Sequence, residues 1–235
     1  MQLKTIKTIE ARLVCLTGLH IGAGSEEMHI GGVDNPVIKN PADGYPYIPG
    51  SSIKGKMRSL MEWRSGQVKE APLSWKDWIT SQDQKVLTIL QLFGVSGSSN
   101  LSASEAEVLG PARLAFWDCT MNQAWLEDKV MRQNLPVCEV KSENVINRIT
   151  GTAQHPRQTE RVVPSAVFDF KLSVKCMDGD EDRFVEEALK GMKLLELDGL
   201  GGSSSRGYGK IKFEAVRLDG EDIANRFNTI TPFAD

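Results

Sequence analysis

Residues 31–60 read GGVDNPVIKNPADGYPYIPGSSIKGKMRSL, and this stretch is the most informative part of the 235-residue sequence. A loop rich in glycine and proline carries Asp34, and a helix capped by serine is predicted to follow it. The first turn of that helix carries Lys54 and Lys56, although a helix N-terminus already bears about half a positive charge. A bound phosphate would offset this repulsion, so the sequence predicts an anion-binding site at the helix start.

The composition is that of an ordinary globular domain, with 40% hydrophobic and 25% charged residues. A net charge of −3 argues against a protein that coats nucleic acid through bulk charge, so any such contact needs a local basic surface. The four cysteines are far apart and form no CxxC or Cys/His cluster, which favours reduced thiols in a cytoplasmic protein. Neither a signal sequence nor a membrane span is indicated, and we expect no membrane partner.

The predicted elements follow the order strand, helix, strands, helix, strand. Hydrophobic alternation predicts strands at residues 5–16, 113–118, 167–174 and 210–218. One amphipathic helix is predicted to start at Ser51 or Ser52, and a second covers residues 182–197. This order fits an α+β fold with a ferredoxin-like, RRM-type palm, in which an antiparallel sheet is backed by two helices.

Two long insertions interrupt this single domain of residues 1–235. Residues 66–110 are predicted to form a helical and loop insertion, with a helix over 75–93 and a loop over the small, polar run 95–107. Residues 137–164 are polar and basic and are interrupted by glycine and proline, which predicts a thumb-like hairpin that leaves the palm.

Residues 199–209, GLGGSSSRGYG, hold five glycines and three serines between a predicted helix and a predicted strand. Such a loop lets backbone approach a partner closely, and Arg206 offers a charged, planar fork. A simple turn needs fewer glycines, so a binding loop is favoured over a long helix-to-strand turn.

Catalytic motifs of common enzyme classes are absent or incomplete in the sequence. Residues 50–56 match most of a P-loop, but Met57 stands where the Mg²⁺-binding Ser or Thr belongs, which disfavours nucleotide hydrolysis. No Ser-His-Asp or paired-carboxylate pattern is visible. Taken by itself, Asp34 is more often a turn-forming residue than a catalytic one.

Six segments considered together resemble the RAMP superfamily. They are LHIG at 19–22, VDNPV at 33–37, YIPGSSIKGKMRSL at 47–60, RITG at 148–151, RQTER at 157–161 and LGGSSSRGYGK at 200–210. Within the superfamily they resemble the repeated backbone subunit of the type III-A CRISPR effector, the Csm complex. The matches run from the first predicted strand to the last.

The resemblance implies a guide-RNA-binding filament subunit that cleaves bound target RNA at regular intervals as a metal-dependent endoribonuclease. The family's catalytic aspartate corresponds to Asp34, which would also bind a loosely held divalent metal, Mg or Mn. The thumb-like hairpin would interrupt the guide–target duplex. Together with the local patterns, the resemblance assigns RNA binding to His20, Ser51, Ser52, Lys54, Lys56, Arg58, Gly201, Gly202, Ser203 and Arg206.

The implied partners are guide RNA, target RNA, further copies of the chain arranged head to tail, and the other type III-A subunits. Those subunits are a large polymerase-like subunit, a small subunit and capping RAMP subunits. One alternative is a purely structural guide-RNA-binding filament subunit, and Asp34 argues against it. Another is a stand-alone RAMP endonuclease for precursor guide RNA. Such enzymes usually need a histidine arrangement, and His20, His29 and His155 have no evident partner.

Overall fold

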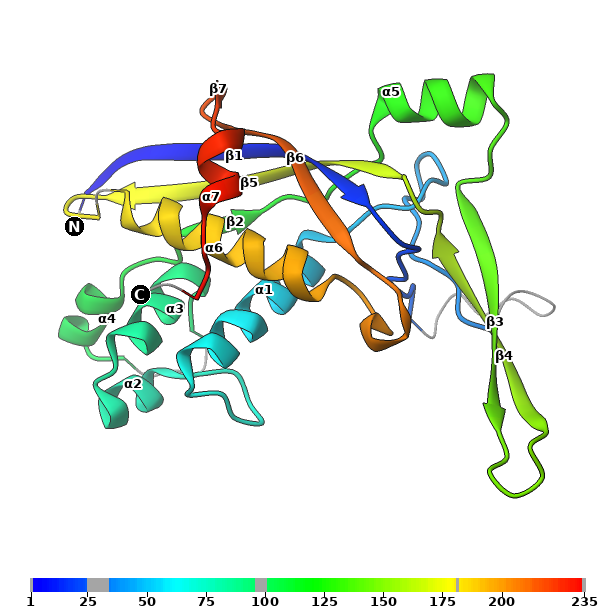
Figure 1. The fold of residues 1–235 in the computed structure, drawn as a ribbon. Helices are drawn as coiled ribbons and strands as arrows, with labels where there is room; N and C mark the ends of the chain where they lie inside the picture. Colours follow the sequence, from blue (N-terminus) through cyan, green and yellow to red (C-terminus); the bar gives the residue numbers. More distant parts are fainter. Residues whose placement is uncertain (1, 25–33, 96–100, 181, 234–235) are drawn as a thin grey trace.

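The computed structural model describes residues 2–24, 34–95, 101–180 and 182–233. Its main sheet has five strands in the order β2-β5-β1-β6-β7, and every neighbouring pair is antiparallel (Figure 1). The strands are β1 (Leu3–Cys15), β2 (Leu114–Phe116), β5 (Val167–Met177), β6 (Ile211–Leu218) and β7 (Glu221–Asp222).

Two helices, α1 (Gly50–Ser65) and α6 (Arg183–Asp198), cover one face of this sheet (Figure 1). They pack closely at Gly191, where an added Cβ would lie 2.8 Å from the Met57 side chain. The inward side chains of β1 and β5 alternate as predicted and are buried: Ile9, Ala11, Leu13 and Cys15 on β1, and Phe168, Phe170, Leu172 and Val174 on β5. The strand order and the two helices confirm the predicted ferredoxin-like α+β palm.

Helix α1 begins at Gly50 and lacks the predicted serine cap. Pro49 occupies the N-cap position and no side chain of a cap residue bonds the helix, so the prediction of a start at Ser51 or Ser52 was wrong. Instead, Asp118 Oδ1 accepts the Gly50 N–H at 2.7 Å. A carboxylate at this position suits the helix dipole.

The insertion after α1 consists of α2 (Trp75–Ser81), α3 (Gln84–Phe93) and α4 (Ala103–Leu109). The pattern at 75–93 is therefore two helices, separated at Gln82 with φ 52°. Helix α4 begins inside the run predicted as a loop and continues two residues beyond it; residues 96–100 of that run fall outside the described part. The missed signal is the capping box formed by Ser102 and Glu105.

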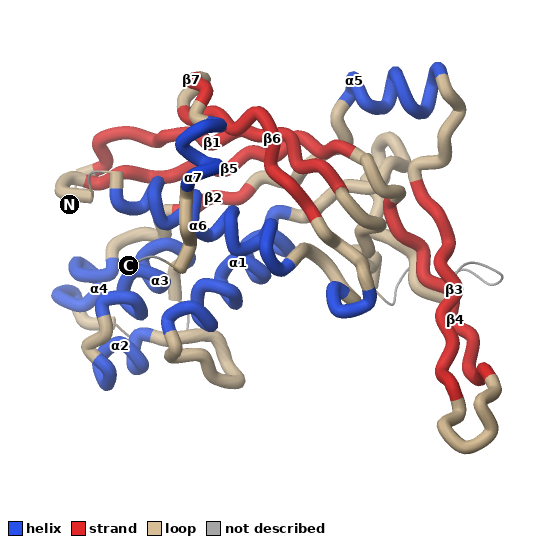
Figure 2. Tube along the Cα trace, viewed as in Figure 1, coloured by secondary structure: helices blue, strands red, loops and turns tan. Residues whose placement is uncertain are grey.

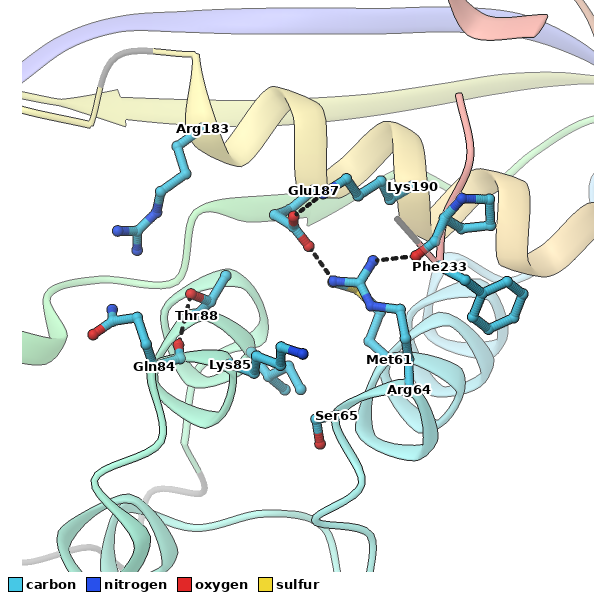
Figure 3. A pocket seen from close by; sticks show the side chains of 12 residues that line it. Met61, Arg64, Ser65, Gln84, Lys85, Thr88, Arg183, Glu187, Lys190 and Phe233 are labelled. Atoms are coloured by element: carbon cyan, nitrogen blue, oxygen red, sulfur yellow. Dashed lines mark hydrogen bonds and ion pairs between the residues drawn. The ribbon is translucent and has the colours of Figure 1, made fainter. Parts of the chain in front are cut away.

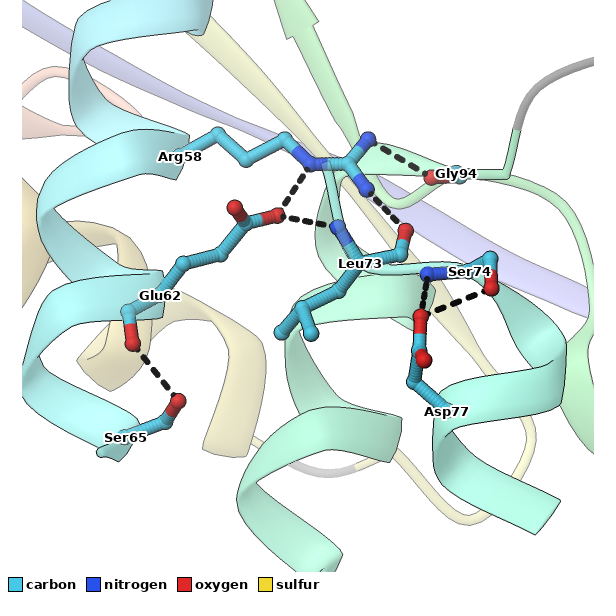
Figure 4. Close-up of polar contacts among 7 residues, drawn as sticks. All are labelled: Arg58, Glu62, Ser65, Leu73, Ser74, Asp77 and Gly94. Carbon is cyan, nitrogen blue, oxygen red and sulfur yellow. Dashed lines mark hydrogen bonds and ion pairs between the residues drawn. The ribbon is translucent and has the colours of Figure 1, made fainter. Parts of the chain in front are cut away.

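Arg58 of α1 forms hydrogen bonds that connect α1 to this insertion (Figure 4). Its guanidinium donates to Glu62 Oε1 at 2.8 Å, to Gly94 O at 3.0 Å and to Leu73 O at 2.7 Å. Glu62, only 5% exposed, also accepts the Leu73 N–H at 3.1 Å. With each guanidinium nitrogen engaged inside the protein, this geometry argues against the RNA contact predicted for Arg58.

Strands β3 (Cys138–Ile146) and β4 (Ala153–Val162) form a separate two-stranded antiparallel hairpin that extends away from the palm (Figures 1 and 2). Helix α5 (Gln123–Trp125) and the π-helix η2 (Leu126–Arg132) precede the hairpin. The short 3-10 helix η3 (Ser204–Arg206) lies in the glycine-rich loop, and α7 (Ala224–Thr229) packs Phe227 against Phe213 of β6. Within the described residues, no helix has the length and apolar character needed to cross a membrane.

Candidate functional site

The inner half of β4 joins the hairpin to two palm loops. One edge of β4 pairs with β3, and the opposite edge forms isolated bridges with Leu19 and Asn35. Leu19 and Val162 exchange both backbone hydrogen bonds, at 3.0 and 2.8 Å, and Glu160 N donates to Asn35 O at 3.0 Å. Because a strand edge presents regularly spaced donors and acceptors, β4 sets the spacing between the two loops.

Asp34 continues this pairing through its side chain. Its Oδ2 accepts the Gln158 N–H at 3.1 Å, and the residue is exposed. The other carboxylate oxygen, Oδ1, has no hydrogen-bond partner within the described part of the chain. An exposed carboxylate held at one oxygen leaves the second oxygen available to a cation or a hydroxyl proton.

His20 is held by the same strand. Its Nδ1 lies 2.6 Å from Glu160 O, and because a carbonyl can only accept, Nδ1 must carry the proton. The His20 carbonyl accepts the Gly202 N–H at 3.0 Å, which joins this loop to the glycine-rich loop. Among the described residues, Nε2 has no partner and remains available to a ligand.

The glycine-rich loop packs tightly against the segment around His20. Gly201 has φ 74°, and a Cβ there would overlap the His20 carbonyl oxygen. Gly209, with φ 66°, would collide with the Leu200 carbonyl in the same way, and its N–H donates to Gly18 O at 2.9 Å. Close backbone approach therefore explains part of the glycine content.

Arg206 lies where this loop meets the base of the hairpin. Its side chain is 58% exposed and its guanidinium lies 3.3 Å from the Glu143 carboxylate, while Lys141 Nζ donates to Arg206 O at 3.3 Å. Tyr208 is buried beneath Lys141 and Arg161, whose cationic groups lie 4.4 and 5.0 Å from its ring centre. Burial, and next the Glu143 carboxylate, raise the pKa of Tyr208, so it is a neutral packing group.

The charges at the start of α1 are partly compensated inside the protein. Lys56 Nζ lies 2.5 Å from Asp198 Oδ2, and Asp118 caps the helix as described above. Lys54 is partly exposed and has no ion pair within the described part of the chain. The uncompensated positive charge at the start of α1 is therefore smaller than the sequence indicates, and most of it comes from Lys54.

The structure thus brings most of the predicted site residues to one region. His20, Gly201, Gly202, Ser203 and Arg206 share the glycine-rich loop and its neighbour, and Ser51, Ser52, Lys54 and Lys56 lie in the first two turns of α1. Arg58 points to the helical insertion instead, and His29 lies outside the described residues. Sequence reasoning missed Glu160, whose only signal is a charged residue inside the RQTER segment.

No group of three or more His, Cys, Asp or Glu side chains suited to a metal ion occurs among the described residues. A cavity of about 340 Å³ lies elsewhere, between α1, α3, α6 and the C-terminal segment (Figure 3). Glu187 in its wall pairs with Arg64 at 2.6 Å and with Lys190 at 3.0 Å. None of the predicted site residues lines this cavity.

Comparison with known families agrees with this architecture. A model of the RAMP superfamily matches residues 12–212. The chain therefore belongs to the RAMP superfamily, and the matched region includes both insertions and the glycine-rich loop.

Curated relatives narrow the family to the proteins named CRISPR system Cms endoribonuclease Csm3. The relative from Streptococcus thermophilus is 42% identical over 206 residues, covering 86% of this chain and 84% of that protein. The relative from Methanothermobacter thermautotrophicus is 38% identical over 217 residues, covering 89% and 84%.

Solved structures of Csm3 proteins are also similar to this chain. A Csm3–Csm4 subcomplex of a type III-A CRISPR-Cas interference complex matches with TM-score 0.55 and 27% identity, covering 93% of this chain and 80% of the other. Methanopyrus kandleri Csm3 matches with TM-score 0.58 and 24% identity over 92% and 78%, which supports the shared fold.

Proposed function

We propose that this chain is the repeated guide-RNA-binding subunit of a type III-A CRISPR interference complex and that it cleaves bound target RNA at Asp34. The endoribonuclease name of its relatives and the complex in which a solved relative occurs support the class. The observation that carries the site is the Asp34 carboxylate, which is held at one oxygen and exposed at the other.

RNA binding in this proposal uses the surface formed by the α1 start, the glycine-rich loop and His20. Lys54 and Arg206 supply positive charge, while backbone groups and the serines supply uncharged hydrogen bonds to phosphate and ribose. Such contacts are independent of base identity, which suits a subunit that must hold any guide sequence while base pairing supplies specificity. The net acidity of the chain is compatible with this role because only one surface needs to be basic.

Cleavage in this proposal is attack by a ribose 2′-oxygen on the adjacent phosphorus. The bond to the 5′-oxygen breaks and solvent protonates that oxygen, which leaves a 2′,3′-cyclic phosphate and a 5′-hydroxyl. Asp34 either accepts the 2′-hydroxyl proton or is a ligand of a divalent cation. The exposed carboxylate fits Mg²⁺ or Mn²⁺, which bind few protein carboxylates and keep water or phosphate ligands; a bound cation would supply charge that neutralises the phosphate.

The partners follow from the same proposal: guide RNA, target RNA, further copies of the chain head to tail, and the large, small and capping subunits of the complex. Head-to-tail contacts that do not close give a helical filament, whose length a guide RNA can set. A purely structural subunit remains the alternative function, and Asp34 separates the two.

Replacement of Asp34 tests the proposal. In the assembled complex, Asp34→Ala should abolish cleavage of labelled target RNA while subunit composition, guide content and target affinity stay unchanged. Excess EDTA should stop cleavage by the wild-type complex. Asp43→Asn is the matched control, because Asp43 is an exposed turn residue that accepts the Tyr45 N–H at 2.9 Å, a bond that an amide oxygen can keep. Wild-type cleavage by the Asp34→Ala complex would make this chain a structural subunit.

A further inference from the structure

Glu160 makes contacts from three of its groups at the junction of β4 with the palm loops. Its N–H donates to Asn35 O, and its carbonyl accepts from His20 Nδ1. Its carboxylate accepts the Val37 N–H at 2.9 Å through Oε2 and the Lys39 ammonium at 2.9 Å through Oε1. One residue of the hairpin therefore contacts both the His20 loop and the segment that carries Asp34.

We infer that Glu160 is a positioning residue for RNA cleavage: it holds residues 34–39 against β4 and so fixes where the Asp34 carboxylate meets the RNA. This inference rests on the proposed function, since it assigns no chemistry to Glu160 itself. Glu160 does not contact the reacting atoms in this role. It acts through the segment that begins at Asp34.

The Glu160 side chain supplies an acceptor for the Val37 N–H, which the backbone pairing of this segment lacks. Backbone bonds hold this segment at Asn35, at Pro36, whose carbonyl accepts from Ala23 at 3.3 Å, and at Ile38, which donates to Ile21 at 2.9 Å. The Val37 N–H points instead to the Glu160 carboxylate. Val37 is buried, so this N–H would lose its hydrogen bond if the carboxylate were removed.

The negative charge of Glu160 strengthens these contacts with Val37 and Lys39. The Glu160 side chain is 13% exposed, and a largely buried carboxylate needs charged or N–H partners. Its bonds to an ammonium and to a backbone N–H are both charge-assisted and are stronger than neutral bonds. Among the described residues, the Asp34 side chain is held only by the 3.1 Å bond from Gln158, so its position depends on how firmly the following residues are anchored.

Graded replacement of Glu160 gives the test. Glu160→Ala removes the side-chain contacts with Val37 and Lys39, whereas Glu160→Gln keeps an oxygen for Val37 and loses the ion pair with Lys39. A shift of about 1 Å in a reacting group can cost about a hundredfold in rate. We expect Glu160→Ala to slow single-turnover target cleavage by about ten- to a hundredfold and Glu160→Gln to slow it less, with target affinity within about twofold of wild type.

Hydrogen exchange supplies a readout that does not depend on activity. In both variants the peptide that contains Val37 should exchange faster than in the wild type, and peptides from β1 should be unchanged. Glu214→Gln is the matched control, because Glu214 pairs with Arg12 at 3.8 Å on β6 and β1, away from residues 34–39. It should leave both cleavage and exchange at Val37 as in the wild type.

Two results would overturn the inference. One is wild-type cleavage by both Glu160 variants; the other is a loss of assembly or guide content that accounts for the slower cleavage, since Glu160 would then be merely structural. The Asp34→Ala complex, measured in parallel, keeps the two proposals separate. If that complex still cleaves, the proposed function fails; if it is inactive while the Glu160 variants are normal, only the positioning role fails.

Discussion

The palm and the β3–β4 hairpin use their side chains in opposite ways. Along β5 of the palm, every second side chain is buried against α1 and α6. On β4, residues 153–158 are all exposed, and Ile149 in the connecting turn is 95% exposed. A two-stranded hairpin is at best marginally stable by itself, so its outer half depends on backbone pairing while its side chains are exposed.

The candidate site lies where these two regions meet. Gln158 and Glu160 are on the part of β4 nearest the palm, and they hold Asp34 and His20. Buried side chains therefore stabilise the palm, whereas β4 of the hairpin uses backbone hydrogen bonds to position loops that lack a core of their own.

Removal of Arg58 should destabilise the palm most. Arg58→Met leaves Glu62 as a buried carboxylate without its cationic partner, which should lower the free energy of unfolding by about 3–5 kcal/mol. Urea unfolding of the purified protein measures this. The double variant Arg58→Met/Glu62→Gln should recover part of the loss, and a loss below about 1 kcal/mol would mean that the network is dispensable.

Removing Lys54 and Arg206 should weaken RNA binding without unfolding the palm. For each cation that no longer binds a phosphate, the slope of log affinity against log salt should become shallower by about 0.7 for a single strand. Titration of guide RNA at several salt concentrations measures both effects in the Lys54→Ala/Arg206→Ala variant. Lys212→Ala, an exposed change on β6, is the control; identical affinity and slope in the double variant would exclude these two residues from the RNA surface.

Asp77 should make the helical insertion sensitive to acid. Burial acts to raise the pKa of Asp77, but hydrogen bonds from Lys69 and Ser74 outweigh it and lower the pKa from 3.8 to about 2. The unfolded state therefore binds the proton more readily, so this stabilisation is complete above pH 3.8 and is lost as the pH falls through about 2.

Asp77→Asn should cost about 1 kcal/mol at pH 7, as expected for the removal of a capping interaction. Thermal unfolding of both proteins from pH 7 downward should show this difference shrink below pH 3.8. A difference that stays constant down to the acid limit would contradict the proposed role of the ionised carboxylate.

Shortening the hairpin should have the smallest effect on stability. Replacing residues 144–156 by Asn-Gly joins the paired residues Glu143 and Arg157 and keeps Gln158 and Glu160. Because the removed side chains are exposed, the free energy of unfolding should change by less than about 0.5 kcal/mol. Regularly spaced target cleavage should nevertheless be lost. A variant that unfolds would show that the palm needs the outer hairpin for its stability.

Elements with strong periodicity could be predicted from the sequence. The alternation in β1 and β5 and the amphipathic pattern of α6 predicted the palm because each pattern reports which side chains are buried. Boundaries were less well predicted. The start of α1 depends on Asp118, which is distant in sequence. The break at Gln82 was missed although the next residue, Asp83, is a capping residue that begins α3.

The sequence by itself determined the fold class, the family motifs and the candidate catalytic aspartate. Only the tertiary structure decided which cations are already paired inside the protein: Arg58 pairs with Glu62, and Lys56 pairs with Asp198. It also revealed Glu160, because its partners Asn35 and Val37 are more than a hundred residues away and meet it only when β4 pairs with the palm loops. Hydrophobic periodicity is a local signal, whereas hydrogen-bond partners are chosen by which distant segments the fold brings together.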